Sequence, residues 1–373
     1  MVTGDFLRPV EVEGKAHASL PEFRPSQTEN ILWFYRLFRR KLAEATGLPV
    51  EMLAWNQGVD TGLIYRMLDV EMSTSGWVKA FAATEFPVDL LYFFEDLFDK
   101  ALVVAFEMPE SIKRLLTYLR VPFIDVNVHP IRFLPDVFFA VQTNSAGIFD
   151  LLKPYHTPSD TFYDWADLLS ATAVKLPQPK IPAGGTLVIG QTNVDRSLIV
   201  DGSLRNLASY AAPLREAVGK SGPVLFKPHP YNKTSFGIFE SGLPFDAIEW
   251  TRANIYSLMA HTELQKIVGI SSSVLTEARY FGKEATVLAA SPFSIPDTAR
   301  EARPHCHFSI YDECFDVDFW RTILSAHIGT TALTGHKFRR PPNTLRTSLR
   351  NFWGFNEVSS DIAIQAYEAG KNK

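Results

Sequence analysis

Short apolar runs alternate with amphipathic stretches along the chain, most regularly in its second half. Four runs there have the apolar character of buried strands: 186–190, 223–227, 266–269 and 285–289. Helical patterns lie between and among them: 203–218, 254–260 and a stretch that begins near Ser273. Strands separated by helices predict a parallel, doubly wound sheet, so this half belongs to the α/β class.

The first half gives a less regular pattern. Ser26 to Glu29 has the form of a capping box and predicts an amphipathic helix to about Thr46. Further along, apolar runs predict strands, and Pro109 predicts the start of a helix. These elements are strands at 101–106 and 121–126, and helices at 109–120, 161–174, 344–353 and 358–370. In the stretch 47–100, glycines interrupt any clean period.

The length of 373 residues favours two domains, each large enough to bury its own core. The stretch 175–185 is rich in proline and glycine and is the best linker in the chain. We therefore expect three parts: a first domain over 1–180, a second over 181–335, and carboxyl-terminal helices over 336–373.

Composition excludes several functional classes. The formal net charge is −4, so no overall basic field favours nucleic acid as a partner. No stretch approaches the ~20 apolar residues that span a bilayer, and residues 1–13 lack the apolar core of a signal peptide. The only two cysteines, Cys306 and Cys314, fit no common zinc spacing and suit a reducing compartment. We expect a cytoplasmic protein with ordinary thiols.

Three polar segments follow strands of the predicted parallel sheet. They are Gly190 to Ser197, Lys227-Pro228-His229-Pro230, and Gly269 to Ser273. Because parallel strands end at one edge of their sheet, the three segments should converge there, where ligands bind in open α/β sheets.

The chemistry of these segments suits a phosphate. Two prolines fix Lys227 and His229 on a stiff loop, although the histidine could merely pack there and the lysine could bind loop carbonyls. Serines 271–273 stand at a helix entrance, whose free N–H groups bind phosphate. Glu277 shares a helix face with Ser273 and could accept bonds from ribose hydroxyls. The plainer alternative is ordinary capping with a solvated glutamate.

The ordered series Gln191-x-x-x-Asp195-x-Ser197, Lys227-Pro-His-Pro, and Ser271-Ser-Ser273 with Glu277 resembles bacterial β-Kdo glycosyltransferases of capsule and O-antigen synthesis. It is also similar to bacterial sialyltransferases. The resemblance covers about 185–290. It implies the glycosyltransferase-B fold, with two Rossmann-like domains facing a central cleft. The second domain would hold CMP-Kdo and the first would hold the acceptor, with no metal or other cofactor.

The resemblance also implies roles for individual residues. Asp195 matches the nucleophile of a retaining double displacement, with Gln191 and Thr192 beside the nucleotide. An Asx-turn is the alternative for Asp195, and Asp201 before Gly202 is the more ordinary turn aspartate.

For the incoming hydroxyl, the first domain should supply an acid/base residue. The capsule enzymes carry an acidic, glycine-containing motif that ends in arginine, and 124–132 stands at about that point without the glycine. Asp125 and His129 are the acid/base candidates, and Arg132 would pair with the Kdo carboxylate. The alternative is that all three are buried polar residues tying a strand to a loop.

The expected partners are a nucleotide-sugar donor and an oligosaccharide or lipid-linked acceptor, whose pocket should lie largely in 47–100. Basic and aromatic residues near the carboxyl end would suit peripheral contact with the inner face of the inner membrane. They are Lys337, Phe338, Arg339, Arg340, Arg346, Arg350, Phe352 and Trp353. A helix that braces the first domain is the alternative.

The chain could also be part of a larger glycan synthase. Rival functions are an inverting sialyltransferase, a non-catalytic nucleotide- or glycan-binding domain, and a sugar-nucleotide epimerase.

Overall fold

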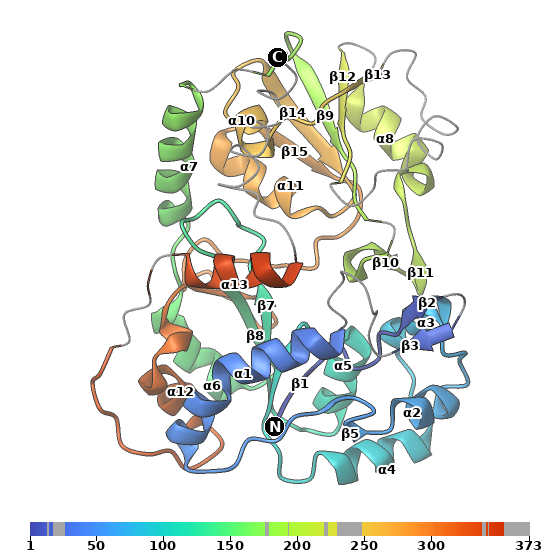
Figure 1. Ribbon diagram of the computed structural model, residues 1–373, viewed down its shortest axis with the longest axis vertical. Coiled ribbons are helices and arrows are strands. Elements are labelled where there is room, and N and C mark those ends of the chain that lie inside the picture. Colours follow the sequence, from blue (N-terminus) through green and yellow to red (C-terminus); the bar gives the residue numbers. More distant parts are fainter. Residues whose placement is uncertain are drawn as a thin grey trace. The chain divides into compact units, whose positions relative to one another are not determined.

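The computed structural model describes residues 1–12, 15–17, 27–175, 179–192, 194–219, 223–229, 248–337, 341 and 343–353 (Figure 1). These residues divide into two compact units. The first contains the described residues of 1–129, 137–158 and 294–353, and the second those of 130–136 and 159–293. Each unit has its own five-stranded sheet.

The sheet of the first unit has the strand order β1-β6-β7-β8-β16. Its strands are β1 (Val2–Gly4), β6 (Val103–Phe106), β7 (Phe123–Val128), β8 (Phe139–Thr143) and β16 (Phe308–Ile310). β1, β6 and β7 run parallel, whereas β8 is antiparallel to both of its neighbours. The sheet is therefore mixed, with a parallel part that ends at one common edge.

Helices and short strands surround this sheet. The helices of the first unit are α1 (Gln27–Thr46), α2 (Thr61–Met67), α3 (Thr74–Ala82), α4 (Val88–Leu97), α5 (Glu110–Tyr118), α6 (Ala146–Leu152), α12 (Val317–Leu324) and α13 (Thr344–Trp353), with 3-10 turns at Lys153–Tyr155 and Glu313–Phe315. Two strand pairs are short: β2 (Val10–Val12) with β3 (Lys15–His17), and β4 (Ala54–Trp55) with β5 (Gly58–Val59).

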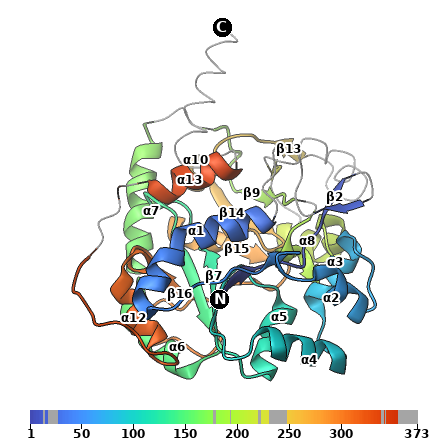
Figure 2. The ribbon, with the colours of Figure 1, turned by 60° about the horizontal axis from the view of Figure 1, so that its bottom comes forward.

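The core of the first unit forms where α1 and α12 pack together against the sheet. Both helices lie side by side in Figures 1 and 2. Phe38 of α1 is fully buried, and its ring lies 5.5 Å from that of Trp320 and 5.8 Å from that of Phe139. Burying one such ring contributes about 2–3 kcal/mol, so this aromatic contact stabilises the unit.

The sheet of the second unit is entirely parallel, with the order β13-β12-β9-β14-β15. Its strands are β9 (Gly185–Ile189), β12 (Val224–Lys227), β13 (Ile248–Trp250), β14 (Leu264–Gly269) and β15 (Glu284–Val287). Counted in chain order within the sheet, this is 3-2-1-4-5, the order of a doubly wound sheet. The order reverses between β9 and β14, and that pair defines the topological switch point.

Helices cover both faces of this sheet. They are α7 (Asp160–Ala173), α8 (Ala211–Val218), α10 (Ile255–Met259) and α11 (Ser273–Ala278), with 3-10 turns at Arg196–Leu198, Leu207–Tyr210 and Arg279–Phe281. Figure 1 shows α8 on one side of the sheet and α10 and α11 on the other. Leu214 of α8 packs on Val188 of β9 and Phe226 of β12, in one buried cluster.

The mixed α/β class with a parallel sheet is the class that the sequence predicted. One predicted helix is wrong in extent: 203–218 is helical only from Ala211, after a 3-10 turn. Ser203–Leu204 instead forms β11, paired antiparallel with β10 (Ile199–Val200). Asp201 and Gly202 both have positive φ, 49° and 66°, which suits the tight two-residue hairpin turn. Asp201 is thus the turn aspartate that we expected.

The chain returns to the first unit earlier than the predicted boundary at 335. Residues 294–335 belong to the first unit, because β16 extends its sheet and α12 packs on α1. α13 also belongs there, with Leu345 buried in its core and Trp33 Nε1 donating to Ser348 Oγ at 2.8 Å. Helix 344–353 is therefore present as predicted, while the predicted helix 358–370 lies outside the described residues.

Burial changes the interpretation of the basic carboxyl-terminal residues. Arg346 is only 5% exposed, so its side chain is not placed to touch a membrane surface. Phe338, Arg339 and Arg340 lie outside the described residues, as do the side chains of Arg350, Phe352 and Trp353. Within the part of the chain that the structure describes, no helix is both long and apolar enough to cross a bilayer.

Both thiols are free and buried in the core of the first unit. Burial raises the pKa of the Cys306 thiol, because the thiolate would lose its hydration. The two residues are thus ordinary core cysteines, as expected.

An ion pair on α12 predicts a pH dependence of stability. Asp318 Oδ1 accepts from Arg321 Nη1 at 2.6 Å, and its Oδ2 accepts from Gly335 N at 2.6 Å. These bonds hold the pKa of Asp318 below its ordinary value of 3.8. The folded pKa is depressed, so this stabilisation is present above about pH 4 and is lost as the pH falls through the folded value. Urea midpoints of the wild type and Asp318→Asn should therefore converge between about pH 5 and pH 2. A difference that stays constant over that range would contradict this assignment.

Candidate functional site

The three polar segments do converge on the carboxyl edge of the parallel sheet in the second unit. β9 ends at Ile189, β12 at Lys227 and β14 at Gly269. Ile189 is in register with Lys227, and Val188 is in register with Val268, so the three strands end at the same level. The segments that follow them therefore share one edge, on both sides of the switch point.

Gln191 joins the loops after β9 and β14 across that switch point. Its Oε1 accepts from Ser271 N at 2.9 Å, and its Nε2 donates to Ser271 Oγ at 3.2 Å. Ser271 Oγ in turn donates to Ser197 O at 2.7 Å. Ser271 is 9% exposed, so these bonds satisfy polar groups that are largely removed from water. An amide that donates and accepts at once is required here, and a carboxylate could not replace it.

Gly190 brings the loops after β9 and β12 into close contact. Its N–H donates to Lys227 O at 2.9 Å. A Cβ at this position would lie 3.0 Å from Phe226 Cζ and 3.3 Å from His229 N, closer than neighbouring atoms tolerate without moving. The glycine therefore lets the backbone of His229 lie directly beside the segment that carries Gln191.

Lys227 binds a loop carbonyl, which is the alternative role that the sequence left open for it. Its Nζ donates to Ala253 O at 2.8 Å, which ties the end of β12 to the loop before α10. The side chain is half-buried, as is that of His229. The bond fixes a cation at the sheet edge, within the loop that also positions the imidazole.

Asp195 caps the 3-10 turn that begins at Arg196. Its Oδ1 accepts from Ser197 N at 2.8 Å, the geometry of an Asx-turn. The side chain is half-buried, and its carboxylate belongs to the same segment as Gln191 and Thr192, itself half-buried. The turn role is thus present, and the nucleophile role stays a prediction.

The serine run marks the start of a helix, as expected, but not through its hydroxyl groups. Ser272 is the N-cap residue of α11 and makes no side-chain capping bond, while Ser273 is the first helical residue. Both side chains are half-buried. Their predicted contact with a phosphate is untested.

Glu277 is a buried carboxylate, so the alternative of a solvated glutamate is wrong. It is 1% exposed, and its Oε1 accepts from Tyr256 OH at 3.2 Å and from Arg132 N at 2.6 Å. Arg132 itself belongs to the second unit, within 130–136. The structure thus brings two predicted ligands of the donor together, one meant for the ribose and one for the sugar carboxylate. No local pattern pointed to Tyr256, because its partner is 21 residues away.

The two acid/base candidates are enclosed in the first unit. Asp125 is 0% exposed, and it accepts from Lys113 Nζ at 2.8 Å, Met108 N at 2.9 Å and Asn127 Nδ2 at 2.9 Å. His129 is also 0% exposed, with its Nε2 3.0 Å from Ser309 Oγ and its ring stacked on Phe138. Neither side chain can reach a substrate in this structure. The contacts of both residues fit the alternative that the sequence left open, in which they are buried polar residues that tie a strand to a loop.

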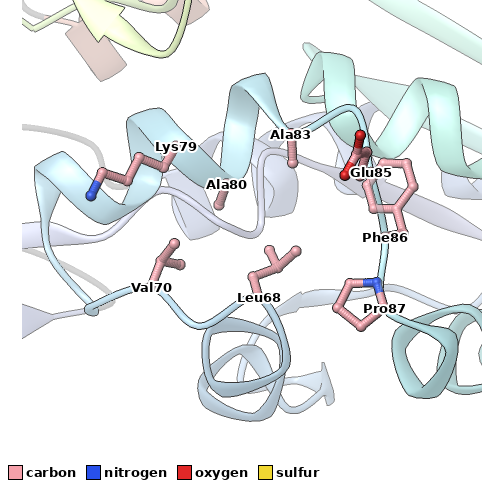
Figure 3. A pocket seen from close by; sticks show the side chains of 8 residues that line it. All are labelled: Leu68, Val70, Lys79, Ala80, Ala83, Glu85, Phe86 and Pro87. Carbon is pink, nitrogen blue, oxygen red and sulfur yellow. The ribbon is translucent and has the colours of Figure 1, made fainter.

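The first unit contains a separate pocket of about 410 Å³ in the stretch 47–100 (Figure 3). Apolar side chains make up most of its lining, with one lysine and one glutamate. The lining residues are Leu68, Val70, Lys79, Ala80, Ala83, Glu85, Phe86 and Pro87. This is the part of the chain in which we expected the acceptor pocket.

The described residues contain no candidate metal site. They contain no group of three or more histidine, cysteine, aspartate or glutamate side chains that could hold a metal ion. The expectation of a metal-independent reaction remains a prediction.

Comparison with known proteins identified solved structures with some likeness to this chain, among them two KpsC structures. One is Thermosulfurimonas dismutans KpsC, beta Kdo 2,7 transferase, at 10% identity and a TM-score of 0.38, covering 79% of this chain and 87% of that one. The other is Thermosulfurimonas dismutans KpsC, beta Kdo 2,4 transferase, at 14% identity and a TM-score of 0.31, covering 59% and 78%. No family model and no curated protein matches. At these TM-scores and identities, neither likeness assigns an activity to this chain.

Proposed function

We propose that this chain is a retaining β-Kdo glycosyltransferase, which moves Kdo from CMP-Kdo to a glycan acceptor of capsule or O-antigen. The proposal rests on the ordered motif series and on one structural observation. Gln191 and Ser271 bond to each other across the switch point of the second sheet, with the His229 loop packed beside them. Nucleotides bind outside the carboxyl ends of the strands at such a point.

In the proposed reaction, a carboxylate oxygen of Asp195 attacks the anomeric carbon of Kdo. The bond from that carbon to the CMP phosphate oxygen breaks, and the electron pair leaves with CMP. The acceptor hydroxyl then displaces Asp195 from the same carbon and loses its proton, so two inversions give net retention. His229 and the Lys227 cation stabilise the charge that grows on the phosphate, without a metal.

We infer a glycosyltransferase-B arrangement of two Rossmann-like domains, in which the second unit holds the donor and the first unit binds the acceptor. The pocket between Leu68 and Pro87 is our candidate for an acceptor subsite, because its apolar walls and two charged groups suit a sugar ring or a lipid-linked glycan. We also propose that the reaction takes place in the cytoplasm.

A thermal-shift comparison of CMP with UMP, UDP and GDP tests which nucleotide the protein binds. At a CMP concentration of about 100 times its Kd, mass action stabilises the binding unit by about 2.7 kcal/mol. For a unit of this size that is a Tm increase of roughly 5–10 °C. UMP is the matched control, because it differs from CMP only in the base. A response to UDP or GDP that equals or exceeds the response to CMP would contradict the proposal.

The contact made by Asp195 favours one rival, an inverting sialyltransferase-like enzyme. In that reaction the aspartate would only cap the turn at Ser197, the role that its 2.8 Å bond to Ser197 N already gives it. The rival predicts that no sugar becomes attached to the protein during turnover. A non-catalytic nucleotide-binding domain would bind CMP with the same selectivity but release none from CMP-Kdo.

A further inference from the structure

The segment 130–136 belongs to the second unit, although it is separated from the rest of that unit in the sequence. Two kinds of contact hold it there. Arg132 N donates to Glu277 Oε1 at 2.6 Å. The ring of Phe133 packs edge-to-face on three aromatic rings of the same unit, at 5.2 to 6.1 Å between centroids: Tyr256, Tyr280 and Phe281. A carboxylate and an aromatic cluster therefore fix this segment together.

The carboxylate of Glu277 is taken up by groups of the protein. The residue is 1% exposed, and the oxygen that accepts from Arg132 N also accepts from Tyr256 OH at 3.2 Å. A ribose hydroxyl would have to displace these donors to reach it. A bond from a backbone N–H to a carboxylate is roughly twice as strong as a bond between neutral groups. The contacts of Glu277 are thus those of a residue that holds the segment 130–136 in place.

Glu277 stands one helical turn after the serine run. Ser273 and Glu277 are the first and fifth residues of α11, so they lie on one face of the helix, about 6 Å apart along its axis. The bond to Arg132 N therefore brings the segment 130–136 within about one turn of the helix terminus at which we expect the donor phosphate. This placement depends only on contacts inside the second unit.

Arg132 is the single basic residue of the segment, whose sequence is Pro-Ile-Arg-Phe-Leu-Pro-Asp, and it is half-buried. CMP-Kdo carries two anionic groups, the phosphate and the sugar carboxylate, and CMP lacks the second. A guanidinium binds a carboxylate through two parallel N–H···O bonds, and this geometry requires a fixed backbone. A segment that is already anchored loses little entropy when the ligand binds.

We propose that Glu277 is a positioning residue, which holds Arg132 for the sugar carboxylate of the donor and does not bind the nucleotide. This inference rests on the proposed function. It assigns the preference for an acidic sugar to one bond inside the second unit, from Arg132 N to Glu277 Oε1. Loss of Glu277 should therefore weaken the binding of CMP-Kdo and leave the binding of CMP unchanged.

The test measures the Kd of CMP and of CMP-Kdo by isothermal titration of the full chain, with Asp195→Asn in every protein so that the donor is not consumed. Glu277→Ala should weaken CMP-Kdo binding about 10-fold or more, the size of a lost hydrogen bond to a charged group. Its Kd for CMP should stay within about threefold. Arg132→Ala keeps the backbone bond to Glu277 and should show the same selective loss. Combining the two substitutions should add little, because both remove one interaction.

Three variants serve as controls. Glu277→Gln keeps an oxygen that can accept both bonds, and Tyr256→Phe removes only the weaker donor at 3.2 Å. Arg279→Ala removes an exposed cation that directly follows α11, so it matches Arg132→Ala in charge. All three should bind both ligands within about threefold of the parent protein. The Tm of each variant shows whether it is folded.

The outcomes separate this inference from the proposed function. Equal weakening of CMP and CMP-Kdo in Glu277→Ala would indicate a ribose contact and overturn the inference, with the proposed function intact. Arg132→Ala that binds CMP-Kdo as tightly as the parent protein would also overturn it, even if Glu277→Ala does not fold. A parent protein that binds neither ligand would overturn both.

Discussion

Asp195→Asn is expected to abolish turnover of CMP-Kdo while leaving the fold intact. The asparagine side-chain oxygen can still accept the bond that Asp195 Oδ1 accepts from Ser197 N at 2.8 Å, so the turn that begins at Arg196 is kept. The neutral amide cannot attack the anomeric carbon. Loss of a catalytic nucleophile lowers kcat by several powers of ten, and we expect at least about 1,000-fold here. The measurement is CMP release, with Tm recorded for each variant.

Two controls separate the nucleophile from the turn. Asp201→Asn changes the aspartate of the hairpin turn between β10 and β11 and should retain full activity. Asp195→Ala removes the cap as well and should lose about 1 kcal/mol of stability in addition to activity. Intact mass of the wild type after brief exposure to CMP-Kdo without acceptor should show one added Kdo, which Asp195→Asn should lack. Full activity of Asp195→Asn, or an adduct located on another residue, would eliminate Asp195 as the nucleophile.

The second unit was predictable because its elements are specified locally. β9, β12 and β14 each contain a short apolar run that periodicity can recognise. β13, with the sequence Ile-Glu-Trp, contains no such run and was not predicted. The convergence of the segments after β9, β12 and β14 then follows from the geometry of parallel strands alone. What the pattern could not give is the strand order, which depends on contacts between residues far apart in the chain.

No helix or strand was predicted in the stretch 47–100, because its glycines were taken as interruptions of any regular pattern. Gly76 lies in the first turn of α3, where a Cβ would come 1.7 Å from Glu71 O. The glycine is needed there for close packing of the preceding backbone, not to end a helix. Gly58, with φ +75°, makes the tight turn at β5. Local periodicity cannot distinguish these uses of glycine from a loop.

The sequence predicted where the site residues lie, but it did not predict which groups they bind. The sequence placed Lys227 and Glu277 at the sheet edge, yet Ala253 O and Arg132 N, the groups they bind, come from other segments of the second unit. The sequence also did not show how deeply each side chain is buried. Asp125 lies in a strand whose residues are all buried, so a polar residue at that position had to find partners inside the unit.

Asp125→Asn is expected to give the largest loss of stability among the variants considered. Asp125 is fully buried, and the variant leaves the ammonium of Lys113, with a side chain 9% exposed, without its nearest carboxylate at 2.8 Å. Breaking a buried ion pair by removing one partner typically costs 3–5 kcal/mol. Glu110 still lies 2.9 Å from Lys113 Nζ, on the exposed side, so we expect a loss near the lower limit, about 3 kcal/mol. Urea unfolding should show the midpoint lowered by roughly 1 M.

The cause of that loss can be separated from a general disturbance of the core by a second substitution. If the penalty comes from a buried charge without its partner, then Lys113→Met in the Asp125→Asn background removes that charge and should restore part of the stability. The Met108 N–H should lose little in either variant, because an asparagine oxygen can accept the bond that Asp125 Oδ1 accepts at 2.9 Å. A double variant less stable than Asp125→Asn would show that Lys113 stabilises the unit by its packing and not through the ion pair.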